Sequence, residues 1–98
     1  MGYFAVCSFD LAHAGPDDYE KAYAALAALG LNRKLVTALG NEIALPTTTT
    51  AGEFSGNSVG ALRNYLTDAI RMAFLELGFH AEIFVFVSNE WAWGQRST

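Results

Sequence analysis

Residues 3–10 read YFAVCSFD, and this stretch decides the fold class. Aromatic and other β-favouring side chains fill it, as is typical of a strand, and Asp10 closes it. Residues 80–88 (HAEIFVFVS) have the same character near the other end of the chain. We therefore predict a sheet that contains both segments as strands.

Two helices are predicted between these strands. The first begins at residues 16–18, where Asp17 is the expected cap and Glu20 stands three positions later, as in a capping box. It is expected to end before Gly30, because glycine commonly follows the last turn of a helix. The second helix, residues 59–77, has the strongest apolar repeat at spacings of three and four in the chain.

The middle of the chain is predicted to form a hairpin. Residues 33–39 are strand-like, Gly40 and Asn41 mark a turn, and residues 42–54 return with a threonine run. The resulting order is strand, helix, strand, strand, helix, strand. This order predicts a ferredoxin-like α+β sandwich with the first and third strands at the centre and both helices on one face of an antiparallel sheet.

Length and composition limit the remaining choices. The 98 residues are enough for a single domain over residues 1–98, with residues 89–98 as a C-terminal tail or a short extra strand. A hydrophobic content of 52% with 16% charged residues excludes disorder. The net charge of −4 argues against broad binding to nucleic-acid phosphates. One cysteine excludes a disulfide framework, and no membrane or signal segment is expected, so we predict a cytoplasmic protein.

Large apolar side chains occupy both faces of the first and last predicted strands. One chain supplies helices for only one face, and a large exposed apolar patch usually marks an interface. We therefore expect a homodimer packed through open sheet faces, although the C-terminal tail could instead fold back over its own sheet. The expected interface residues are Phe4, Val6, Phe84, Phe86, Trp91 and Trp93.

A few side chains are candidates for chemistry. Asp10 ends an apolar strand, where it and its mate across a dimer axis could share Mg²⁺ or Mn²⁺. The plainer interpretation is a strand-end aspartate that hydrogen-bonds the next loop. His13 could transfer protons, or could be a solvated loop histidine. Cys7 lies among apolar neighbours and is expected to be a small buried hydrophobe.

The segment YFAVCSFDL, residues 3–11, resembles the first strand of the small CRISPR adaptation nucleases, in which an apolar strand ends in aromatic–Asp–apolar. It also resembles GhoS-type antitoxin endoribonucleases. The resemblance implies a ferredoxin-like homodimer joined through its sheets, with Asp10 as the metal ligand. The CRISPR proteins carry arginines in the following loop and helix, whereas residues 13–26 here (HAGPDDYEKAYAAL) contain none.

Two functions from different classes follow. The first, which we favour, is a small homodimeric interaction or regulatory module, with another protein or RNA as a further partner. The alternative is a metal-dependent endoribonuclease or nuclease-like protein of the CRISPR or toxin–antitoxin type, with Asp10 and His13 as its catalytic residues. The acidic balance and the missing arginines favour the module. A small-ligand sensor would rest on analogy with the fold alone.

Overall fold

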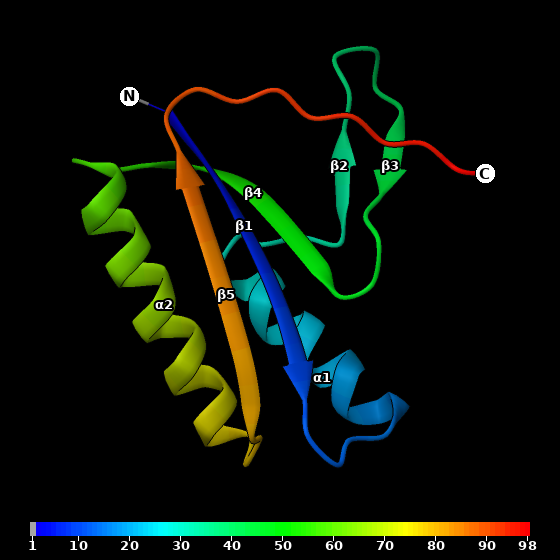
Figure 1. Ribbon diagram of the computed structural model, residues 1–98, viewed down its shortest axis with the longest axis vertical. Coiled ribbons are helices and arrows are strands. Elements are labelled where there is room, and N and C mark those ends of the chain that lie inside the picture. Colours follow the sequence, from blue (N-terminus) through cyan, green and yellow to red (C-terminus); the bar gives the residue numbers. More distant parts are fainter. Residues whose placement is uncertain (1) are drawn as a thin grey trace.

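Strand β1 (Gly2–Leu11) is the centre of the main sheet in the computed structural model, which describes residues 2–98. It pairs antiparallel with β4 (Thr49–Ser55) on one side and with β5 (Ala81–Ser88) on the other, which gives the order β4-β1-β5 (Figure 1). Residues 3–10 and 80–88 therefore lie in neighbouring strands, as predicted. The predicted α+β class with an antiparallel sheet is confirmed.

Both helices cover the same face of this sheet. Helix α1 (Pro16–Ala28) and helix α2 (Val59–Glu76) bury their apolar stripes against β1, because its odd-numbered side chains all point toward them. The core is one continuous cluster, so each layer is stabilised by the other. Its fully buried large side chains include Leu26, Leu31, Leu66, Ile70 and Phe74.

The helix ends follow the expected chemistry, with one correction. Ser58 caps α2, and its hydroxyl oxygen accepts a hydrogen bond from the Ala61 N–H at 3.0 Å. In α1 the cap is Gly15 rather than Asp17, and the Asp18 carboxylate accepts from the Gly15 N–H at 3.1 Å. The helix starts directly at Pro16, because proline suits the first helical position, and this moves the cap upstream.

The predicted hairpin forms only in part, and its first strand does not join the main sheet. Strands β2 (Lys34–Val36) and β3 (Glu42–Ala44) pair only with each other and form a separate two-stranded sheet. One bridge, between Asn32 and Ala51, links the start of this hairpin to β4. The third predicted strand is therefore present as β4 and pairs along β1 as expected, but on its outer side it carries only this single bridge. The turn at Gly40, which has a positive φ of 86°, joins β2 directly to β3. Pairing of these two strands closes only a short loop, and closure of a short loop costs less entropy than pairing with a strand farther along the chain.

The C-terminal segment, residues 89–98, contains no strand, so the predicted extra strand is not formed in the single chain. A bend follows β5, where the Ser88 hydroxyl accepts a hydrogen bond from the Glu90 N–H at 3.2 Å. The segment then crosses the end of the sheet as an irregular tail (Figure 1). Within residues 2–98, no helix is long and apolar enough to cross a membrane.

Candidate functional site

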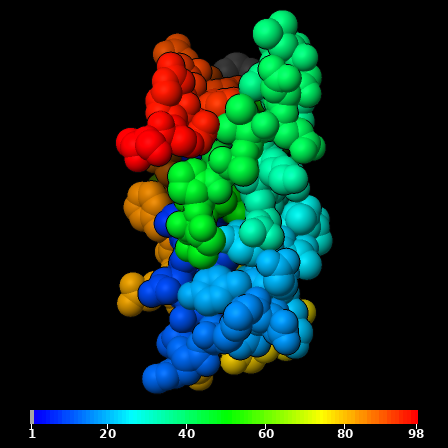
Figure 2. All heavy atoms as spheres, turned by 90° about the vertical axis from the view of Figure 1, so that its right-hand side faces the viewer, coloured from blue at the N-terminus to red at the C-terminus, as the bar shows by residue number. Residues whose placement is uncertain are grey.

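The face of the sheet opposite the helices is the candidate site. Even-numbered residues of β1 and β5 point toward this open face and stand directly opposite each other, with Val6 paired to Phe86 and Ser8 to Phe84. Phe84 is 64% exposed and Phe86 is 53% exposed. Figure 2 shows β5 side chains (orange) projecting from the same side of the molecule as the tail (red). Two large aromatic side chains therefore lie in solvent on a rigid sheet.

The tail covers one end of the open face. The Trp91 ring stacks on Phe4 with ring centroids 5.5 Å apart, and Phe4 is only 6% exposed. The tail thus folds back over its own sheet at this end, which was the alternative to its use in a dimer. Phe4, expected at the dimer interface, is covered by its own chain. Trp93 remains 42% exposed, and the central part of the face stays open.

Two acidic residues stand on neighbouring strands at the other end of the open face. Asp10 on β1 stands directly opposite Glu82 on β5. Asp10 also accepts a hydrogen bond from the Tyr19 hydroxyl at 3.2 Å, which ties the strand end to α1. The sequence reasoning did not single out Glu82. The antiparallel pairing of the first and last strands would have found it, because both acids share the face that carries Phe84 and Phe86.

His80, rather than His13, lines the hollow beside this acidic pair. The hollow has a volume of about 280 Å³ and is lined by Asp10, Ala12, His80, Ala81 and Glu82. His13 lies on the β1–α1 turn with a positive φ of 54° and an exposed side chain. Within residues 2–98, no group of three or more His, Cys, Asp or Glu side chains is placed to hold a metal ion. One chain thus offers two carboxylates at this point.

The remaining candidates are structural in this arrangement. Cys7 is fully buried on the helix-facing side, and burial raises the pKa of its thiol to about 11, against a smaller lowering effect from its hydrogen bond with Thr50. A thiol with so high a pKa is a poor nucleophile at neutral pH. Its predicted place as a small buried hydrophobe is confirmed.

Two of the basic side chains are already engaged near α1. Arg33 contacts Glu20 at 3.3 Å and lies 3.9 Å from the centre of the Tyr23 ring, and Lys34 contacts Glu42 at 3.6 Å. These exposed contacts pair two of the six basic side chains with acids. The open face itself carries aromatic and acidic groups, which suits protein packing better than binding to a phosphate backbone.

Comparison with known proteins adds no family to this picture. No family model matches the chain, and no curated protein matches it. The open sheet face and its two ends are therefore the features from which we infer function.

Proposed function

We propose that this protein is a small homodimeric interaction or regulatory module of the cytoplasm that pairs through the open face of its sheet. The observation that supports this most directly is the exposure of Phe84 and Phe86 on a face that holds no helix. Aromatic side chains are enriched at the cores of interfaces, because each buries a large apolar area at low entropy cost. A second copy supplies the same aromatic strip, so a two-fold axis makes the surface self-complementary.

The direction of the two-fold axis determines whether Asp10 and Glu82 of one copy lie close to Asp10 and Glu82 of the other. With the axis parallel to the strands, Asp10 and Glu82 of both copies meet, and four carboxylates repel one another. With the axis perpendicular to the strands, each acidic pair lies over the tail end of the other copy and the carboxylates stay apart. Because like charges in close contact are unfavourable, the perpendicular arrangement suits a metal-free module.

Sedimentation of three proteins tests the dimer. The wild type should sediment as a dimer at micromolar concentration, whereas the double variant Phe84→Ser/Phe86→Ser should sediment as a monomer with its fold intact. The matched control is Tyr65→Ser, because Tyr65 is 60% exposed on α2, away from the open face. This control should remain a dimer. A monomeric wild type, or equal dissociation by both changes, would overturn the proposal.

The position of Asp10 directly opposite Glu82 favours a second candidate function, that of a metal-dependent nuclease. With the two-fold axis parallel to the strands, two acidic pairs provide oxygen ligands of the kind that Mg²⁺ and Mn²⁺ prefer. This function requires cleavage of RNA or DNA that depends on the metal ion and is lost in Asp10→Asn and Glu82→Gln. The control Glu53→Gln, on the same face at β4, should keep the activity. Cleavage without added metal ion, or cleavage that survives Asp10→Asn, would exclude this function.

A further inference from the structure

The outer edge of β5 is a free strand edge. β5 is the last strand in the order β4-β1-β5, so only its inner side is paired. The Ala12 N–H donates a hydrogen bond to the His80 carbonyl at 2.8 Å. Because hydrogen-bonded and non-hydrogen-bonded residue pairs alternate in an antiparallel ladder, the even-numbered residues of β5 form the backbone hydrogen bonds to β1. The odd-numbered residues therefore direct their N–H and C=O groups outward. They are Ala81, Ile83, Val85 and Val87.

A cleft lies along the first half of this edge. It has a volume of about 370 Å³ and separates the C-terminal half of α2 from the start of β5. Phe74, Phe79 and Ile83 give it an apolar lining, while Arg71 and His80 provide polar groups. The cleft thus combines apolar contacts with basic and hydrogen-bonding groups beside unpaired backbone. Grooves of this kind accept an extended peptide as an additional strand.

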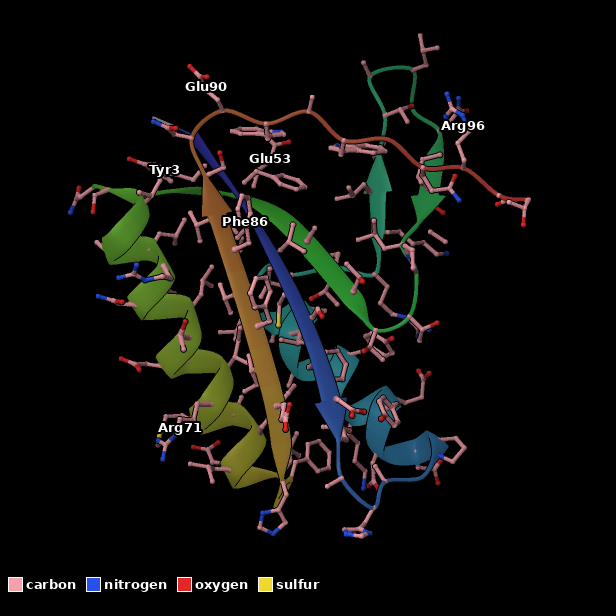
Figure 3. All side chains as sticks on the ribbon, in the orientation of Figure 1. Tyr3, Glu53, Arg71, Phe86, Glu90 and Arg96 are labelled. Atoms are coloured by element: carbon pink, nitrogen blue, oxygen red, sulfur yellow. The ribbon has the colours of Figure 1, made fainter. Side chains whose placement is uncertain are left out.

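The charge of the cleft favours an acidic ligand. The two salt bridges found among residues 2–98 use Arg33 and Lys34, so Arg71 has no ion-pair partner there. Arg71 lines the cleft, and Figure 3 shows its side chain extending from the side of α2 that faces away from β5, so its charged end is open to a ligand from solvent. Asp68 and Glu76 belong to the same helix but do not line the cleft. In a protein of net charge −4, Arg71 gives this cleft one positive charge and its lining contains no acidic residue.

We propose that the β5 edge and the adjoining cleft bind an extended acidic segment of a partner protein. The segment adds to the sheet as a strand beside β5 and places a carboxylate against Arg71. The backbone pairing supplies affinity that is independent of sequence, and the Arg71–carboxylate contact selects for acidic segments. This surface is separate from the open face, so it remains available in a dimer that packs face to face.

A second copy of this chain is a poorer occupant of the edge. Two-fold pairing of two β5 edges would lay the two α2 helices antiparallel beside each other. Arg63, Thr67 and Arg71 recur every four residues and share one stripe of α2. In that arrangement, Arg71 of each copy approaches Arg63 of the other. A single strand with acidic side chains brings no second helix and no second set of arginines.

Labelled peptides test the proposal by fluorescence anisotropy and amide chemical shifts. The probe is a peptide of alternating valine and glutamate with the length of β5, 8 residues. Its matched control replaces every glutamate by lysine. We expect the acidic peptide to bind at least about tenfold more tightly, a difference of about 1.4 kcal/mol. The largest amide shifts should fall on the four outward-facing residues of β5.

Protein variants separate the backbone and charge contributions. Arg71→Glu should weaken binding of the acidic peptide about tenfold or more, whereas Arg71→Lys, which keeps the positive charge, should retain most of it. Val85→Pro removes an outward N–H and leaves the β1 ladder intact, so it should abolish binding while the protein stays folded. If that variant unfolds, a peptide N-methylated on alternate residues blocks the same pairing without any change to the protein.

Several outcomes would overturn the proposal. These are the absence of binding, equal binding of the lysine peptide, or shifts centred on Phe84 and Phe86 instead of the edge. A dimer that survives Phe84→Ser/Phe86→Ser but is lost in folded Val85→Pro would identify a second copy as the occupant. Measuring peptide binding in the Phe84→Ser/Phe86→Ser background keeps this result independent of the proposed open-face dimer.

Discussion

Phe4 and Trp91 stack with their ring planes inclined by 20°, which fixes the C-terminal tail over one end of the sheet. The contact joins the first strand to a segment that lies beyond the last strand. It covers Phe4 but leaves Phe84 and Phe86 in solvent. The part of the open face that remains exposed in the single chain therefore contains Phe84 and Phe86.

Replacement of Trp91 by alanine should destabilise the single chain. The change removes an aromatic pair and exposes Phe4, at an expected cost of about 1–2 kcal/mol in the free energy of unfolding. Urea unfolding of the Phe84→Ser/Phe86→Ser background measures this effect without a contribution from the dimer. Trp93→Ala is the control, because Trp93 has no stacking partner among residues 2–98. Equal losses for the two tryptophans would contradict the assigned role of Trp91.

Replacement of Gly52 by alanine should be among the most damaging small changes in the chain. A Cβ atom at Gly52 would lie 2.0 Å from the Gly30 carbonyl oxygen, so β4 and the end of α1 would have to separate. We expect a loss of about 2–4 kcal/mol in the free energy of unfolding.

The control for this change is Gly60→Ala. Gly60 lies within α2, where a Cβ atom would meet nothing closer than 3.8 Å. Alanine there should stabilise the protein by about 0.5–1 kcal/mol, because it favours the helix. Thermal unfolding compares the two variants, and a neutral Gly52→Ala would show that the two backbones do not approach this closely.

Stability should fall in alkaline solution because of Cys7. Burial raises the pKa of its thiol from 9.0 to about 11. Below pH 9 the thiol is protonated in both states, so its contribution is fully present. Between pH 9 and about 11 the unfolded thiol ionises while the folded one does not, and up to about 3 kcal/mol is lost.

Comparison with Cys7→Ala isolates this effect from other groups that titrate at high pH. The variant starts from a lower stability, because it leaves a small gap in the core. The difference between the two free energies of unfolding should shrink as the pH rises through this range. A constant difference would mean that the native thiol ionises as readily as the unfolded one.

The carboxylates of Asp10 and Glu82 should repel each other across the strands. Glu82→Gln is expected to stabilise the protein by roughly 0.2–1 kcal/mol at low ionic strength, and the gain should decrease in high salt. Glu53→Gln is the control on the same face, because Glu53 stands opposite Phe4 rather than an acid. Urea unfolding at two salt concentrations measures both variants. A salt-independent gain would point to packing rather than charge.

The divalent-ion response of the same proteins bears on the nuclease alternative. If the acidic pairs bind Mg²⁺ or Mn²⁺, either ion should raise the unfolding temperature of the wild type, because a ligand of the native state stabilises it. The increase should vanish in Asp10→Asn and persist in Glu53→Gln. No shift with either ion would favour the metal-free module.

Short-range sequence patterns are sufficient to predict the local elements of this protein. The alternation in residues 3–10 and 80–88, the apolar repeat of residues 59–77 and the glycines that end the helices follow from short-range sterics and burial. These signals need only neighbouring residues, so they predict both helices and both long strands. The buried position of Cys7 followed in the same way, from the apolar residues beside it.

Which distant groups share a surface depends on long-range pairing in the folded chain. The register between β1 and β5 places Asp10 opposite Glu82, and the bend after Ser88 brings Trp91 over Phe4. The strand order also leaves the outer edge of β5 unpaired beside the cleft that Arg71 lines. Register and edge exposure depend on how strands pair across the whole chain. A shift of one residue moves every side chain of a strand to the other face, and because both faces of β1 and β5 carry large apolar side chains, long-range packing makes that choice.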